Sequence, residues 1–507
     1  MNRRFLGNLD AASDKRFEDH FIDSLDLARI DSRHSDIVYG SKGAGKTALR
    51  RALTELKKPK FYTTKTINLD QISFSEVHVA LSILKESSSI EIATLARNIW
   101  CNVLAMYCLE AVAESLDHGH GLKREITELL HKENFLEDDS NNRLIGFIER
   151  LFIKIANSSL EKAIPSPLGL SKEQRHLINS FPSSPIVKNL LEKSSGWISA
   201  TNKVALICLD GFDSIVDHTP ESRKAIFAGL IDAIHKCSRD PLLADAFCFK
   251  AFLPQELTDT AHTIIWDEDK FIQRSHYLRW SASDFEKFLR ARLAPYAKTK
   301  SIDFIDIWQD FMPDKVHNDS HRIDEPSLGY ILRHTLYRPR QILAHLQEIL
   351  DCWDEVSNKF KIDPSFIPPI VAKTNHKLAG SVVNQLEVTY PGLSIFMQSW
   401  SGSPNVVSVR EFHARMKRFL QYSGSETNSI FDVLFNFGVF GISRKSNTSR
   451  GMQQTRFRFA FVGNSMIPNI HAVVDEFDLL AFSPMFHEYC GCIPSKYGAI
   501  IPTDRFS

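Results

Sequence analysis

Short apolar runs alternate with longer segments of helical periodicity along the first half of the chain. This alternation is typical of a parallel β-sheet that is covered by helices. We expect the strands of that sheet at residues 37–39, 61–69, 204–209, 246–253 and 263–266. Residues 73–199 separate the second strand from the third, and their helical periodicity predicts an all-helical insertion. Its length is unusual for a connection inside such a sheet, so it is either a specificity module or a surface for partners.

The second half of the chain has helical periodicity from about residue 283 onward. We expect helices at residues 283–293, 302–311, 328–335, 339–355, 381–386, 394–400, 409–420 and 430–437. Pro364, Pro368 and Pro369 mark the end of the first four of them. Two strands, at residues 439–443 and 455–462, follow the last helix and are joined by a polar loop. Helices followed by a two-stranded ribbon are typical of a winged-helix domain.

The first expected strand leads into a glycine-rich loop of the pattern GxxxxGK[ST] and then into a helix-forming series that starts at Ala48. Glycine can adopt backbone conformations that are closed to other residues, so successive N–H groups can point at phosphate oxygens. The helix adds its positive N-terminal end. A chance glycine turn is the alternative, but the flanking strand and helix argue against it. The expected nucleotide-binding residues are Gly40, Ser41, Lys42, Gly43, Ala44, Gly45, Lys46, Thr47 and Ala48.

Lys46 and Thr47 have separate expected roles in this loop. The Lys46 ammonium supplies a cation to the β- and γ-phosphates, and the Thr47 hydroxyl ligates a Mg²⁺ that bridges them. No Asn-Lys-x-Asp motif follows the fourth expected strand, which favours adenine over guanine. The expected ligands are therefore ATP and Mg²⁺.

A metal-positioning carboxylate is expected at the end of a neighbouring buried strand. The apolar run at residues 204–209 ends at Asp210, which fits the Walker B pattern and predicts that Asp210 holds Mg²⁺ directly or through water. A turn-capping role for Asp210 is the alternative. The next residue is Gly211, where many ATPases of this kind have a glutamate that polarises the attacking water. Asp213 is the nearest carboxylate for the role of base, and a role in capping a turn or helix fits it nearly as well.

Arg340 lies near the start of an expected helix, because Pro339 occupies a favourable first-turn position. In a helical lid folded over the phosphates, such an arginine contacts the γ-phosphate and responds to its loss on hydrolysis. A surface arginine beside a proline is the alternative interpretation.

Composition limits the classes of protein. A chain of 507 residues implies about three domains of roughly 150 residues each. Lys plus Arg and Asp plus Glu each number 61, so no net charge draws the chain to nucleic acid or anionic lipid. The eight scattered cysteines suit reduced thiols in the cytosol. Because residues 1–15 lack a secretory pattern and the apolar segment 92–113 contains polar residues typical of a buried helix, we expect a cytoplasmic protein without membrane contact.

The phosphate loop, residues 209–213, the helix entry at 278–292 and the segment 337–340 together resemble bacterial P-loop ATPases of the AAA+/STAND group. Those proteins are similar to origin-recognition ATPases and often occur beside phage-defence genes. The resemblance covers about residues 6–350, and the C-terminal block more loosely. It implies a Walker A pair of Lys46 and Thr47, a Walker B acid at Asp210 and a sensor-2 arginine at Arg340.

Two departures from that family pattern concern hydrolysis. The fourth expected strand ends without the usual Asn, Thr or Arg sensor, and only Gln255 is placed to replace it. The glutamate that usually follows the Walker B acid is missing as well. Both departures favour a slow switch over a fast ATPase.

These expectations give an α/β fold class: a P-loop parallel sheet with helices on both faces, at residues 1–72 and 200–282, with three further parts. They are the helical insertion (73–199), a helical lid (283–375) and a winged-helix-like C-terminal domain (376–507). The expected function is an intracellular ATPase switch whose nucleotide state controls engagement of a protein partner or self-association. A role in antiviral defence is implied by the resemblance only. The alternatives are a DNA-binding AAA+ loader or remodeller, and a P-loop small-molecule kinase, which is disfavoured because no acceptor pocket is evident.

The DNA alternative depends on basic residues around the expected hairpin. Phe457, Phe459 and Phe461 are expected to alternate inward, which leaves the arginines between them on the outer face. The helix at 430–437 is apolar nearly all round and should be buried, which favours a protein-contact or regulatory wing. The basic residues are Arg444, Lys445, Arg450, Arg456 and Arg458.

His487, Cys490 and Cys492 lie close together in the sequence and suggest a second, weaker metal hypothesis. A zinc site needs a fourth ligand, and no second pair of ligands with suitable spacing is evident. Cys208, in the middle of an expected strand, is interpreted as a core residue.

Overall fold

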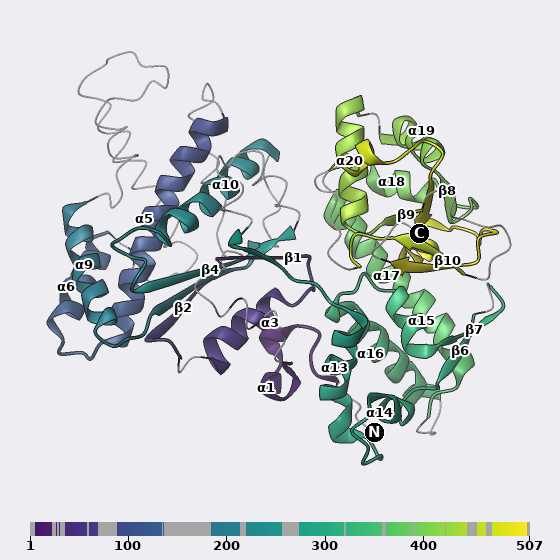
Figure 1. Cartoon of the computed structure of the whole chain (residues 1–507), viewed down its shortest axis with the longest axis horizontal. Coiled ribbons are helices and arrows are strands. Elements are labelled where there is room, and N and C mark those ends of the chain that lie inside the picture. Colours follow the sequence, from purple (N-terminus) through teal and green to yellow (C-terminus); the bar gives the residue numbers. More distant parts are fainter. Residues whose placement is uncertain are drawn as a thin grey trace. The chain divides into compact units, whose positions relative to one another are not determined.

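The computed structural model describes residues 6–22, 27, 30, 36–57, 60–68, 89–133, 135, 184–212, 220–255, 273–318, 321–356, 361–387, 390–420, 422–443, 454–462 and 469–503 (Figure 1). The chain forms two compact units. The sheet unit comprises Asp23–Lys42 and Lys46–Leu278. The helical unit comprises Met1–Ile22, Gly43–Gly45 and Arg279–Ser507.

The sheet unit contains a five-stranded sheet in the order β2-β3-β4-β1-β5, and all neighbouring strands are parallel. Its strands are β1 (Ile37–Gly40), β2 (Thr63–Asn68), β3 (Ala205–Asp210), β4 (Phe247–Pro254) and β5 (Ser275–Tyr277). The first four confirm predicted strands. The strand predicted at 263–266 lies outside the described residues, and β5 is the fifth strand. Because the strands are parallel, the segments that follow β1 and β3 leave the same edge of the sheet, with only β4 between them.

Helices flank this sheet, so the expected α/β fold is confirmed. They are α3 (Lys46–Arg51), followed by a π-helical turn (Ala52–Leu56), and α5 (Ser89–Ser115), α6 (Gly121–Lys132), α9 (Pro185–Ser199) and α10 (Pro220–Cys237). Figure 1 shows α5 and α10 on one face of the sheet and α3 on the other. Successive strand residues, which point to opposite faces of the sheet, are both buried, for example Ile207 and Cys208. Both faces of a parallel sheet are covered, so this is expected.

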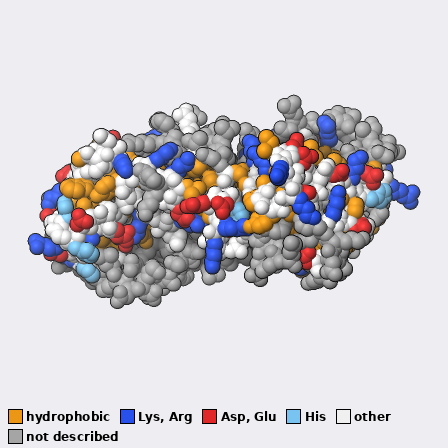
Figure 2. Space-filling view, turned by 90° about the horizontal axis from the view of Figure 1, so that it is seen from below, with side chains coloured by type: hydrophobic (Ala, Val, Ile, Leu, Met, Phe, Trp, Pro, Cys, Tyr) orange, Lys and Arg blue, Asp and Glu red, His pale blue; other side chains and the backbone are white. Residues whose placement is uncertain are grey.

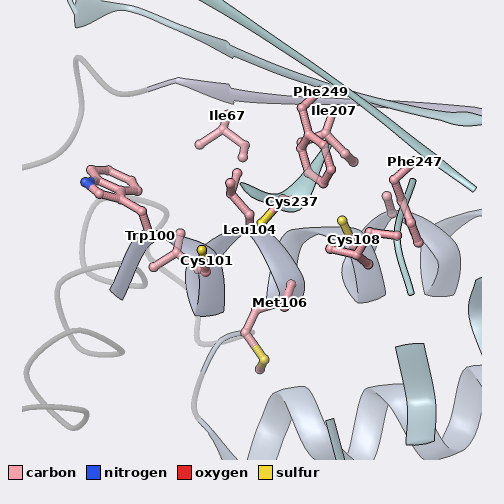
Figure 3. Close-up of a cluster of buried hydrophobic side chains, with 14 of the residues drawn as sticks. Ile67, Trp100, Cys101, Leu104, Met106, Cys108, Ile207, Cys237, Phe247 and Phe249 are labelled. Atoms are coloured by element: carbon pink, nitrogen blue, oxygen red, sulfur yellow. The ribbon is translucent and has the colours of Figure 1, made fainter. Parts of the chain in front are cut away.

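The core of the sheet unit forms where α5 lies on the strands. Side chains of α5 such as Leu104 and Cys108 meet Ile207 and Phe249 of the sheet (Figure 3). The buried helix predicted at 92–113 is therefore confirmed as part of α5. Within the described residues, this part of the expected insertion shares one core with the strands.

The helical unit begins with the N-terminal segment, which includes α1 (Phe17–His20) and packs on later helices. The guanidinium of Arg292 donates to the carbonyl oxygens of Leu6 (3.2 Å) and His20 (2.8 Å) and thereby ties that segment to α13. The elements that follow are α13 (Ala282–Leu293), α14 (Phe304–Gln309), the antiparallel strands β6 (Lys315–Asn318) and β7 (Ile323–Pro326), α15 (Ser327–Arg333), α16 (Pro339–Val356) and α17 (Ile367–Glu387).

The predicted start of α17 is wrong. Pro368 and Pro369, which the pattern analysis placed between helices, occupy its first turn. Proline is well tolerated there because the first N–H groups of a helix have no intrahelical acceptor. α17 therefore includes the shorter helix expected at 381–386.

The last part of the helical unit contains a second sheet, in the order β12-β10-β9-β11-β8. β9 and β10 are antiparallel neighbours, as the predicted hairpin requires, and β9 also pairs with β11. The winged-helix interpretation stays a prediction. The elements are α18 (Leu393–Gln398), β8 (Val406–Ser408), α19 (Val409–Leu420), α20 (Gly424–Asn436), β9 (Phe440–Ser443), β10 (Gln454–Arg458), α21 (Ile470–Val473), β11 (Leu479–Phe482), α22 (His487–Cys490) and β12 (Ala499–Thr503).

Candidate nucleotide-binding site

The loop between β1 and α3 has the backbone that a phosphate-binding loop needs at two of its three glycines. Gly43 has φ +86° and Gly45 has φ +105°, both in the left-handed region that residues with a Cβ rarely adopt. Gly40 differs from the expectation, because it is the last residue of β1 and pairs with Pro254 in the sheet. Its backbone is therefore set by the strand and not by a left-handed turn.

Lys46 is the first residue of α3, and only 5% of its surface is exposed. Its Nζ donates to the carbonyl oxygens of Gly40 (2.8 Å) and Ser41 (3.4 Å). The ammonium therefore folds back over the loop that precedes it. A buried cation held by neutral carbonyl groups at a helix N-terminus is suited to an anionic ligand.

Asp210 ends β3, and its carboxylate has two partners in the structure. Oδ1 accepts from the backbone N–H of Gly211 (2.9 Å), and Oδ2 accepts from Nε of Arg50 (3.0 Å). Arg50 lies four residues after Lys46 and three after Thr47, so the three residues share one face of α3. The structure thus places the Lys46 face of α3 at the end of β3.

The other predicted residues of the loop differ in how far they are exposed. Lys42 is exposed, whereas Ser41, Thr47 and Ala48 are half-buried. Asp213, the candidate base, lies outside the described residues. No described interaction tests the metal role predicted for Thr47.

The tip of the loop, Gly43–Gly45, packs within the helical unit. Nε1 of Trp280 donates to the carbonyl oxygen of Ala44 (2.8 Å), and the backbone N–H of Arg340 donates to the carbonyl oxygen of Gly43 (3.5 Å). In a trans peptide the C=O and N–H groups point in opposite directions. These contacts therefore also orient the N–H groups of Ala44 and Gly45.

Arg340 is the second residue of α16, as expected for an arginine that follows a first-turn proline. Its guanidinium lies 3.6 Å from Oδ1 of Asp10, and its Nε donates to the carbonyl oxygen of Leu9 (3.4 Å). The side chain is 42% exposed, so this ion pair contributes little to stability. The sensor role of Arg340 stays a prediction.

Sequence reasoning missed two residues of the site, Arg50 and Trp280. Arg50 stood in the helix-forming series after the loop, and its spacing from Lys46 was the available signal. Trp280 stood in the family-like entry to α13, without a sign that its indole reaches the loop.

Comparison with known proteins bears on this geometry. Residues 8–240 match the family model described as ORC-CDC6-like. This part of the chain is therefore similar to that family. The match confirms the expected likeness to origin-recognition ATPases of the AAA+ class. The structure is also similar to that of the ORC2 protein of Aeropyrum pernix, solved as ADPNP-ADP complexes, with 10% identity over 96% of each chain and a TM-score of 0.40. No curated protein is similar enough to the chain to count as a match.

The residues at the end of β3 and the start of α3 include oxygen donors that fit a nucleotide-bound Mg²⁺. Carboxylate and hydroxyl oxygens are the ligands that Mg²⁺ prefers, and Asp210 and Thr47 supply one of each. In the structure, the Arg50 guanidinium forms an ion pair with the Asp210 carboxylate. Cys208, on the same strand, is buried, and burial raises the pKa of its thiol well above the usual range, which suits the predicted core role.

The second metal hypothesis, at His487, Cys490 and Cys492, has no support among the described residues. Nε2 of His487 donates to the backbone carbonyl oxygen of Phe482 (3.0 Å), and a hydrogen bond with Cys492 raises the pKa of Cys490. Across the part of the chain that the structure describes, no group of three or more His, Cys, Asp or Glu side chains could hold a metal ion.

The inward alternation predicted for the second strand of the hairpin is confirmed at two of its three phenylalanines, and Phe461 is half-buried. Phe457 and Phe459 are buried, whereas Arg456 is exposed and Arg458 half-buried. Most apolar side chains of α20 are buried as well. Three of the basic residues singled out, Arg444, Lys445 and Arg450, lie outside the described residues.

Proposed function

We propose that the protein is an intracellular ATP-binding switch that hydrolyses ATP slowly. The observation that carries this proposal is the buried ammonium of Lys46 on a glycine loop, one helical turn from the Arg50 contact with Asp210. The ORC-CDC6-like match supports the same class of ligand.

We assign the residues of the site separate roles toward a bound nucleotide. The loop N–H groups and Lys46 would hold the phosphates, and Thr47 and Asp210 would hold Mg²⁺, which would neutralise charge on the β- and γ-phosphates. Gly211 follows Asp210 and has no carboxylate to orient an attacking water. Hydrolysis is therefore expected to be slow, with Asp213 as the remaining candidate base.

The switch acts through the loop tip. Trp280 and Arg340 contact Ala44 and Gly43, so a nucleotide that reorders the tip is expected to shift α13 and α16. Arg340 would report the γ-phosphate. We propose that the responding surface engages a protein partner or a second copy, and the link to antiviral defence depends on the family resemblance alone.

A second candidate function is a DNA-binding loader, favoured by the ORC-CDC6-like match together with the exposed Arg456. On the face in Figure 2, Lys and Arg side chains lie among Asp and Glu side chains. This mixing favours the protein-partner hypothesis. Binding of duplex DNA that falls steeply with salt concentration would support the loader, and no binding at low salt would remove it.

Lys46→Ala and Asp210→Ala test the proposed function. Lys46→Ala should weaken ATP binding by at least about ten-fold, because the phosphates lose a charge-assisted contact. Asp210→Ala should keep binding but lose turnover by about a hundred-fold or more. Equilibrium binding and phosphate release measure the two effects.

A matched control comes from Lys193→Ala. Lys193 lies on α9 and pairs with Glu125 of α6, so its replacement should leave both readouts unchanged. ATP binding by Lys46→Ala at the wild-type affinity would contradict the proposed site.

A further inference from the structure

We propose that Arg50 is a positioning residue that holds the Asp210 carboxylate while the metal is absent and releases it when Mg²⁺-nucleotide binds. This inference rests on the proposed function, since it concerns the metal that accompanies ATP. It assigns Arg50 a role in setting the Mg²⁺ concentration at which the switch responds.

The geometry shows that Arg50 is built into the site. Its Nε lies 3.0 Å from Oδ2 of Asp210, and Nη1 donates to Oγ1 of Thr66 on β2 (3.4 Å). The side chains of Arg50 and Asp210 are only 16% and 9% exposed. β2 and β3 are adjacent, so the guanidinium is fixed by two neighbouring strands at the edge where the site lies.

Each oxygen of the Asp210 carboxylate accepts one hydrogen bond in this arrangement. Arg50 takes Oδ2, and the Gly211 N–H takes Oδ1. A Mg²⁺ held by Asp210 needs one of these oxygens, and it would lie close to the positive guanidinium. Like charges at this range repel, most strongly where water is excluded. The ion pair and the metal therefore compete for the same carboxylate.

Linkage gives the sign of the effect. A contact that is present in the metal-free state and lost in the loaded state lowers the affinity for the ligand that requires the loss. Removal of Arg50 should therefore tighten Mg²⁺ binding. It should also destabilise the free protein, because Asp210 is then buried without its cation. If Arg50 had only a structural role, its removal would weaken both Mg²⁺ binding and the stability of the free protein.

The test compares Arg50→Ala with Arg51→Ala. Arg51 is the next residue on α3 and pairs with Glu55 in the π-helical turn that follows, so it is a matched control. ATP affinity is measured across a Mg²⁺ titration and in EDTA, and thermal unfolding is measured without nucleotide. Arg50→Lys keeps the charge without the guanidinium geometry.

We expect Arg50→Ala to lower the Mg²⁺ concentration for half-maximal ATP binding by about 5- to 150-fold, the usual range for coupled sites. Its affinity in EDTA should match the wild type, and its melting temperature should fall. The Mg²⁺ requirement of Arg50→Lys should lie between those of Arg50→Ala and the wild type. Arg51→Ala should keep the wild-type Mg²⁺ dependence.

An unchanged or higher Mg²⁺ requirement in Arg50→Ala, with normal ATP binding by the wild type, would overturn this inference alone. If Arg50→Ala does not fold, the Mg²⁺ titration of Arg50→Lys replaces it, and an unchanged or higher Mg²⁺ requirement in that variant would overturn the inference. A wild-type protein that binds no Mg²⁺-ATP would overturn the proposed function and this inference together.

Discussion

At the scale of single residues, the candidate site depends on a few side chains that orient backbone groups and charges. Trp280 is the clearest of them. Its indole donates to the Ala44 carbonyl, and its ring packs against Phe285 and Phe288 at centroid distances of 5.2 and 5.3 Å. The indole thus fixes the Ala44–Gly45 peptide, whose N–H points away from the indole.

Trp280→Phe tests this role. The ring packing is largely kept while the N–H donor is lost, at a cost of about 1 kcal/mol for one hydrogen bond. ATP affinity should therefore fall by about five-fold in a binding titration. Trp197→Phe is the control. Trp197 lies on α9, and its indole donates to the hydroxyl of Tyr62 and not to the loop. Equal affinities of Trp280→Phe and the wild type would exclude the positioning role.

Sequence reasoning predicted the residues of this site whose position follows from spacing in the chain. Lys46 and Asp210 stand at fixed places in a loop pattern and at a strand end, so their positions in the fold followed directly. Arg50 and Trp280 act through contacts between residues far apart in the sequence. Nothing in the local pattern around either residue shows which carboxylate or carbonyl group it meets.

At the scale of elements, the strong hydrophobic patterns gave correct predictions and the short elements did not. β1, β3, β4, α13, α16 and α19 each carry a clear apolar pattern, and all were predicted. β5, β6 and β8 have only three or four residues each, and pairing with neighbouring strands defines them more than their own composition does. The start of α17 was missed because prolines were taken as helix ends.

The contact between α5 and α10 gives a prediction at this scale. A Cβ on Gly229 of α10 would lie 2.5 Å from the Cβ of Ala96 and 2.7 Å from the backbone N of Arg97, both on α5. Gly229→Ala should therefore force the helices apart and destabilise the protein by about 1–3 kcal/mol, despite the better helix propensity of alanine. Denaturant unfolding measures the loss.

Gly196→Ala is the matched control for this change. Gly196 lies within α9, and a Cβ there meets no atom within 4 Å. That variant should be as stable as the wild type or more stable. Equal stability of Gly229→Ala and Gly196→Ala would show that the two helices do not need the close approach.

At the scale of the whole molecule, the family match covers mainly the sheet unit, and the helical unit adds its own chemistry. None of the helices among the described residues combines the length and hydropathy needed to cross a membrane. The helical unit buries several histidines: His334, His345 and His487. Their burial is the main cause that lowers each pKa, and nearby Arg333 adds to the effect at His334 and His487.

These histidines predict acid sensitivity of the helical unit. Burial lowers the pKa of His345 and of His487 to about 4, from the ordinary value of 6.5. The unfolded chain therefore binds protons that the folded protein does not, as the pH falls from about 6.5 to about 4. Stability should be full above that window and fall through it, by up to about 3 kcal/mol per histidine.

Chemical denaturation at a series of pH values measures this slope, and His345→Gln should reduce it. Nε2 of His345 donates to the carbonyl oxygen of His334 (3.2 Å), and the side-chain amide of glutamine can donate the same hydrogen bond. A stability that does not change between pH 6.5 and pH 4.5 would contradict the prediction.

The central claim is that a triphosphate binds at the loop between β1 and α3. Isothermal titration of the wild type and Lys46→Ala with a non-hydrolysable ATP analogue and Mg²⁺ tests it most directly. The account predicts saturable binding at one site per chain in the wild type and a loss of at least about ten-fold in affinity in Lys46→Ala. No binding by the folded wild type, or equal binding by both proteins, would contradict it.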